Sequence, residues 1–164
     1  MDNEIKEYEA ILSEDEKTYF DELYGHILAL GYKPKKEKKK SISFDFKHRL
    51  VKNSIVKFSS EHGQPYLKLK FFATKEYSPC FKEAIRTTIE EFNYKYTGCY
   101  RCGKCGFNLE GYTYSYADGR KYFRCGLELI EIKDFLNIDI EETKNLISNQ
   151  HHFYLSKLKE NSGK

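Results

Sequence analysis

The chain has 164 residues, of which 40% are hydrophobic and 32% charged, with a formal net charge of +3. This composition fits one water-soluble domain and leaves no apolar run long enough to cross a membrane. Disorder throughout is excluded, because 12 phenylalanines and 14 tyrosines need a core in which to pack. The first nine residues carry four acids and one lysine, which predicts no leader peptide and a cytoplasmic location.

The first half of the chain predicts a helix, a run of strands and a second helix. Residues 13–16 have the form of a capping box, and apolar residues recur behind them at helical spacing, so a helix is expected over about residues 14–30. Alternating apolar and polar residues then predict three antiparallel strands near residues 42–47, 55–58 and 67–71. Ser78 and Pro79 are typical of a helix start, and the helix that follows is expected to lie across the sheet.

The second half predicts a hairpin, a strand and a long helix. Tyr112 to Tyr122 alternate around Asp118-Gly119, which is a strong hairpin signal. A strand is expected near residues 127–132, and a second capping box at residues 139–142 opens the last helix, with a frayed tail after residue 160. The fold class is therefore α+β, with an antiparallel sheet packed by two or three helices in a single domain. Its parts are a helix–strand meander–helix (13–96), a Cys-rich hairpin subregion (97–132) and a C-terminal helix (139–160).

The positive charge gathers in one short segment. Residues 33–40 hold six lysines in eight positions, namely Lys33, Lys35, Lys36, Lys38, Lys39 and Lys40. Such a run could contact the phosphates of a nucleic acid. Only five of the 28 basic residues are arginine, the side chain that best reads guanine edges, so base-specific recognition is disfavoured. The simpler interpretation is a solvated linker between a helix and a strand.

Four of the five cysteines lie within 27 residues and predict a metal site. Cys102 and Cys105 have knuckle spacing, each followed by a glycine that permits a tight turn around the sulfurs. The hairpin is expected to return Cys125 to the same place, and Cys99 supplies a fourth ligand. Cationic neighbours (Arg101, Lys104 and Arg124) would favour the thiolates. We expect one zinc ion in a closed tetrahedron of Cys99, Cys102, Cys105 and Cys125.

Several alternatives stay open for these cysteines. Three closely spaced cysteines and a distant one also resemble half of a ferredoxin motif, so an iron–sulfur cluster is the rival cofactor; the missing proline after Cys125 and the polar loop weigh against it. A redox dithiol is a third possibility. His151 or His152 could replace Cys99 as a ligand, whereas Cys80, at the start of the second helix, is expected to be an inert thiol.

Four segments resemble a known superfamily. The strand at residues 67–72, the helix start at 78–85, and the segments 129–132 and 141–147 together are similar to small bacterial domains of the YdhG-like, frataxin-like superfamily. The resemblance implies a compact α+β domain with a curved antiparallel sheet, and iron handling as proposed for some relatives. The cysteine cluster departs from that pattern, and the resemblance carries over no catalytic residue.

These observations favour a binding or regulatory module over an enzyme. The sequence contains no phosphate-binding glycine loop, no nucleophile elbow and no carboxylate pair at a spacing typical of acid–base catalysis. The expected function is a small cytoplasmic zinc protein. An iron–sulfur or iron-handling protein using the same cysteines, and a nucleic-acid-binding protein using Lys33 to Lys40, are the alternatives.

Overall fold

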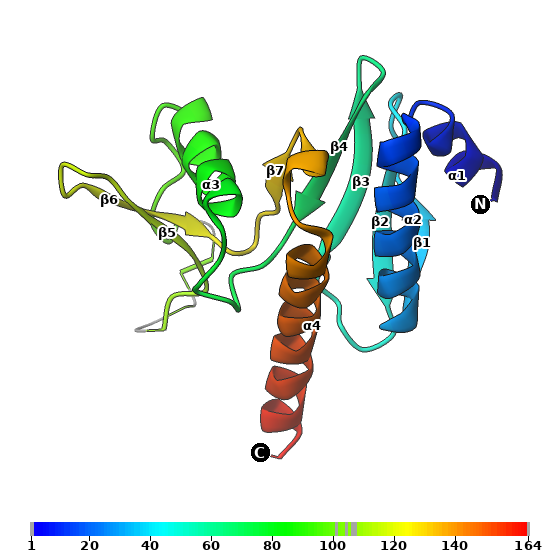
Figure 1. Ribbon diagram of the computed structural model, residues 1–164. Helices are drawn as coiled ribbons and strands as arrows, with labels where there is room; N and C mark the ends of the chain where they lie inside the picture. The colour runs from blue at the N-terminus through cyan, green and yellow to red at the C-terminus, as the bar shows by residue number, and fades with distance from the viewer. Residues whose placement is uncertain (1, 101, 104, 106–107, 164) are drawn as a thin grey trace.

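The computed structural model describes residues 2–100, 102, 103, 105 and 108–163. Over these residues the fold is α+β (Figure 1). The helices are α1 (Asp2–Glu9), α2 (Glu14–Ala29), α3 (Pro79–Glu91), the short 3-10 helix η1 (Phe135–Asn137) and α4 (Ile140–Ser162). The strands are β1 (Tyr32–Lys36), β2 (Ser43–His48), β3 (Val56–Glu61), β4 (Gln64–Leu69), β5 (Gly111–Ser115), β6 (Lys121–Cys125) and β7 (Ile130–Ile132).

The strands form two antiparallel sheets. The larger has the order β1-β2-β3-β4-β7, so that the first four strands are a meander and β7 returns to pair with β4. The smaller sheet is the β5–β6 hairpin. The predicted α+β class and antiparallel pairing are therefore confirmed, with one more meander strand than expected.

One face of the large sheet carries the core. Side chains alternate along a strand, so Phe44 and Phe46 of β2 point to the same face as Phe58 of β3. The helix α2 places Phe20 against Phe58, with ring centroids 4.8 Å apart, and α1 adds Tyr8, which touches Phe44 and Phe58. The helix α4 joins α2 through the hydroxyls of Tyr19 and Thr143, 2.9 Å apart.

The helix α3 does not lie across the sheet, as the sequence had led us to expect. It lies beside β7 at the end of the large sheet and packs against the β5–β6 hairpin (Figure 1). Phe81 of α3 contacts the ring of Phe71, and the hydroxyl of the buried Tyr112 on β5 accepts a hydrogen bond from the Phe71 backbone N–H at 3.0 Å. Those aromatic contacts join the hairpin and α3 to the end of β4.

Part of the predicted lysine linker is a strand. Residues 32–36 form β1, whose Pro34 lies opposite Phe46 of β2. Lysine and proline have low strand propensity, so the local signal is weak, but both residue types are common on the exposed outer strand of a sheet. The acidic segment 2–9, for which no helix was predicted, forms α1.

The predicted turn and helix starts appear where expected, although Ser78 makes no side-chain cap hydrogen bond and only the Asp139 half of the second capping box forms. Ser13 and Glu16 form the expected capping box, and Gly119 takes a left-handed conformation in the turn of the hairpin. Asp139 caps α4 by accepting the Glu142 backbone N–H at 2.7 Å. The last helix continues to Ser162, through residues expected to fray. Across the described ranges, no helix combines the length and apolar character needed to span a bilayer.

Candidate metal centre and lysine-rich segment

The strand β6 brings distant cysteines to one end of the hairpin. Its last residue, Cys125, pairs with Gly111 of β5. On its other side, Thr97 forms an isolated bridge with Arg124, and the Gly98 backbone N–H donates to the Phe123 carbonyl at 2.7 Å. Because the bridge is antiparallel, the residues after Thr97 run back along β6, and the pairing fixes the start of the Cys-rich segment against the strand that ends in Cys125.

Arg124 holds this arrangement together. Its side chain is only 4% exposed and its guanidinium lies over the ring of Phe92. One amino group donates to the Tyr96 carbonyl at 3.2 Å, and the other pairs with Glu128, which also accepts the hydroxyl of Tyr100. The sequence identified Arg124 only as a cationic neighbour of Cys125, whereas in the structure its side chain also joins residues 96–100 to β6.

The cysteines surround a common cavity. Cys102, Cys105 and Cys125 line a cavity of about 380 Å³, and Cys125 is buried. Burial raises the pKa of the half-buried Cys105, and a hydrogen bond with Cys99 and the charges of the other cysteine side chains raise it further. All four predicted ligands are therefore neighbours, although 26 positions separate Cys99 from Cys125. Cys80 lies elsewhere, at the start of α3.

These neighbours do not yet form a coordination sphere. Among the residues that the structure describes, no group of three or more His, Cys, Asp or Glu side chains could hold a metal ion. The zinc and the iron–sulfur cluster thus both stay predictions. Arg101 and Lys104, which were expected to favour the thiolates, lie outside the described residues.

Apolar side chains from other parts of the chain complete the cavity. Phe72 forms part of the wall, and Leu50, Leu127 and Leu158 are partly exposed around it. The backbone reaches this wall closely at Gly126, where an added Cβ would lie 2.5 Å from Phe72. The sequence could not identify these residues as neighbours of the cysteines, because the chain segments that carry them meet only in the folded molecule.

His151, one of the two histidine alternatives, makes contacts elsewhere, whereas His152 is exposed on α4 and stays a prediction. His151 is buried on α4, where its Nδ1 and the Tyr32 hydroxyl are 3.1 Å apart. Its ring also lies 5.2 Å from that of His48, whose Nδ1 accepts the backbone N–H groups of Leu50 and Val51. Burial lowers the pKa of His151, and the neighbouring His48 and His152 lower it further. His151 therefore belongs to the contact between α4 and the large sheet.

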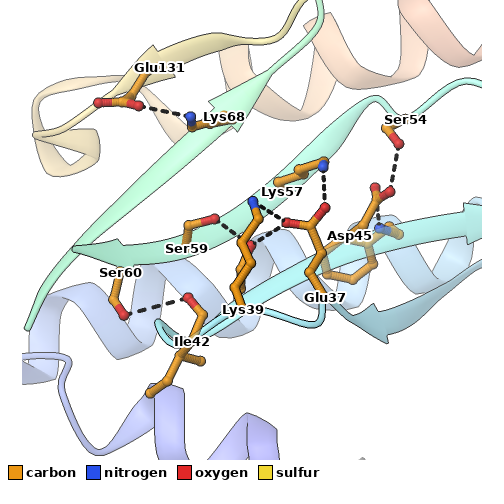
Figure 2. Close-up of polar contacts among 12 residues, drawn as sticks. Glu37, Lys39, Ile42, Asp45, Ser54, Lys57, Ser59, Ser60, Lys68 and Glu131 are labelled. Carbon is orange, nitrogen blue, oxygen red and sulfur yellow. Dashed lines mark hydrogen bonds and ion pairs between the residues drawn. The ribbon is translucent and has the colours of Figure 1, made fainter.

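The lysine-rich segment is partly neutralised. Lys36 lies 3.8 Å from Glu4 and 4.0 Å from Glu7 of α1, and Lys39 pairs with Glu37 at 2.8 Å. Glu37 in turn binds Lys57 of β3, so the two ion pairs of Glu37 meet on the polar face of the sheet (Figure 2). Within the described part of the chain, Lys33, Lys35, Lys38 and Lys40 form no ion pair. The segment thus offers less free positive charge than its sequence suggests.

The fold and these contacts define an α+β protein with two antiparallel sheets and a cysteine-lined cavity at their junction. Comparison with protein-family models, with curated proteins and with solved structures gives no match for this chain.

Proposed function

We propose that the chain is a zinc-binding module in which Cys99, Cys102, Cys105 and Cys125 hold one structural zinc ion. One observation carries the proposal. Cys125 lines the same cavity as Cys102 and Cys105, and Cys99 lies close enough to Cys105 to raise the pKa of its thiol. Packing alone gives no reason for thiols from both ends of a 27-residue segment to meet there, whereas a four-thiolate site requires it.

The chemistry of the donor set supports zinc. Four crowded thiols resist ionisation because each thiolate raises the pKa of the others, as the direction of the Cys105 shift indicates. A divalent cation reverses this effect, and its binding would release protons and draw the segment 99–105 onto Cys125. Structural zinc contributes on the order of 10 kcal/mol to the folding of small modules. The donor types present therefore suit a zinc ion, which would fasten the hairpin to the segment before it.

A site of this kind favours a binding or regulatory role. Zinc with four thiolate ligands has no open position for a substrate. Its role would be structural, because it would fix the positions of the β5–β6 hairpin and of the cavity wall beside α4.

An iron–sulfur cluster is the second candidate, and one observation favours it. The polar loop argued against a cluster, but the cavity is walled by Phe72, Leu127 and Leu158, which come from outside that loop. Apolar shielding is what such clusters usually need. The same four cysteines would serve either cofactor.

Metal analysis of the full chain separates the two candidates. Protein purified anaerobically is assayed for zinc and iron by elemental analysis and for colour by visible absorption. We expect one zinc per chain and no visible band. Cys125→Ser should lose most of the zinc, while the matched control Cys80→Ser, at the start of α3, should keep it. Brown protein with iron and sulfide would favour the cluster, and equal zinc in the Cys125→Ser variant would overturn the four-cysteine site.

A further inference from the structure

A groove runs between α3 and the end of the large sheet, away from Cys99, Cys102, Cys105 and Cys125. It has a volume of about 740 Å³ and is lined on one side by α3 and on the other by β7 and η1 with their flanking residues. The α3 residues in its wall recur every three or four positions from Pro79 to Glu91, so they form one face of the helix. A helix rises 1.5 Å per residue, so this wall is roughly 18 Å long, the length of five or six residues of extended chain.

The base of the groove is apolar. Ile132 and Ile138 lie on the sheet side, and Ala84 and Thr88, whose hydroxyl donates to the Ala84 carbonyl, lie on the helix side. The thiol of Cys80 bridges the two walls by donating to the Asn137 carbonyl at 3.5 Å. A groove of this shape accepts an extended segment whose apolar side chains alternate with polar ones.

The rim of the groove is acidic. Glu83, Glu91, Glu131 and Asp134 contribute carboxylates, whereas Lys133 is the one lysine in the lining. Neighbouring cations reach two of these acids, since Arg86 pairs with Glu83, and Lys68 with Glu131 at 3.0 Å. Among the described residues, Glu91 and Asp134 form no ion pair. The charge left at the rim is therefore negative and complements a basic ligand.

We propose that this groove binds an extended, lysine- or arginine-rich segment of a partner protein. Apolar side chains of the segment enter the base of the groove, and its basic side chains reach Glu91 and Asp134. The opposite end of the sheet is built differently: β1 carries Pro34 and three lysines, a composition that discourages strand pairing. Because β1 lies at the other end of the five-stranded sheet (Figure 1), the lysines of β1 do not fill the groove of the same molecule.

A binding assay with the full chain tests the proposal. The probe is a capped six-residue peptide of alternating lysine and valine, and the control peptide alternates glutamate and valine. Affinity is measured by titration calorimetry, and occupancy of the groove by the alkylation rate of Cys80, read by mass spectrometry. We expect the basic peptide to bind at least about tenfold more tightly than the acidic one, to slow Cys80 alkylation, and to weaken as salt is added.

Two variants locate the binding. Thr87→Arg adds bulk and positive charge to the exposed groove face of α3, and should weaken binding about tenfold or more. Thr18→Arg makes the same change at an exposed position of α2 and should have no effect. Glu91→Gln removes only a charge and should weaken binding severalfold even if Thr87→Arg disturbs folding. Equal binding of both peptides, an unchanged Cys80 rate, or self-association of the chain that protects Cys80 without peptide would each overturn the proposal.

Discussion

Gly126 lacks a Cβ atom, which allows the end of β6 to approach the core closely beside the cysteine cavity. At Gly126, directly after Cys125, a Cβ would lie 2.5 Å from the Phe72 ring and 2.6 Å from the Glu110 carbonyl oxygen. Real Cβ atoms do not tolerate such distances, so a side chain at this position must displace either the ring or the strand. A glycine next to the last cysteine is therefore required by packing, whichever metal is bound.

We expect Gly126→Ala to lower the free energy of unfolding by about 2 kcal/mol, the usual cost of overpacking. Urea denaturation followed by circular dichroism measures the change. The matched control is Gly25→Ala in α2, where nothing lies within 4 Å of the added Cβ and helix propensity predicts a gain of up to about 1 kcal/mol. Equal stability of wild type and Gly126→Ala would contradict the close packing at Phe72.

Glu37 is the charged residue whose environment changes its ionisation most clearly. Burial raises its pKa, but hydrogen bonds from Lys39, Lys57 and Ser43 outweigh that effect and lower the pKa from 4.5 to about 2. Figure 2 shows Lys39 and Lys57 reaching its carboxylate on the polar face of the sheet. Because the pKa is lower in the folded state, the stabilisation is complete above about pH 4.5 and is lost as the pH falls toward 2.

The substitution Glu37→Gln isolates this contribution. At pH 7 the variant should be less stable by about 1–2 kcal/mol, a value reduced for solvent screening at a partly exposed site. The difference from wild type should shrink steadily between pH 4.5 and pH 2.5 in chemical denaturation. A difference that stays constant over this range would show that Glu37 does not titrate as described.

At the scale of an element, the hairpin depends on one side chain that joins it to the segment before the cysteines. Arg124 is buried and makes three contacts, with the Tyr96 carbonyl, the Glu128 carboxylate and the Phe92 ring. Its loss would remove the ion pair with Glu128 and the hydrogen bond to the Tyr96 carbonyl, and so would weaken the attachment of residues 96–100 to β6. Cys99 would then be held less firmly near the other cysteines.

Arg124→Gln should therefore cost about 3 kcal/mol of stability and also weaken zinc binding. Competition with a chromophoric chelator measures the zinc affinity. The control, Arg120→Gln, removes a half-exposed arginine from the turn of the same hairpin, where solvent screens the ion pair with Asp118. If the two variants lose zinc affinity equally, Arg124 does not position the site.

At the scale of the whole molecule, the sequence predicts those helix starts and turns that depend on neighbouring residues alone. The capping box at Ser13, the proline after Ser78 and the Asp118-Gly119 turn each satisfy their own backbone, so their elements appear where expected. The strand β1 and the position of α3 could not be predicted in this way. The strand forms because β2 pairs with it despite its lysines and proline, and α3 is placed by contacts with β7 and the hairpin.

The candidate site likewise has one part that the sequence predicts and another that it does not. Cysteine spacing and the hairpin signal suffice to predict that Cys99, Cys102, Cys105 and Cys125 become neighbours. The cavity wall could not be predicted, because Phe72 and Leu158 come from segments remote in sequence. The contacts of Arg124 could not be predicted either, because no local sequence pattern identifies the partners of a buried arginine. Likewise, the acids of α1 that pair with Lys36, and Lys57 of β3, which pairs with Glu37, reach the lysine-rich segment only in the folded molecule.

X-ray absorption at the zinc edge, on the purified full chain, tests the central claim most directly because it counts the ligand atoms. The proposed site predicts four sulfur atoms at about 2.3 Å and no nitrogen or oxygen ligand. Cys80→Ser should leave this spectrum unchanged. A first shell with fewer than four sulfurs, or with nitrogen or oxygen at about 2.0–2.1 Å, would contradict a zinc ion held by Cys99, Cys102, Cys105 and Cys125.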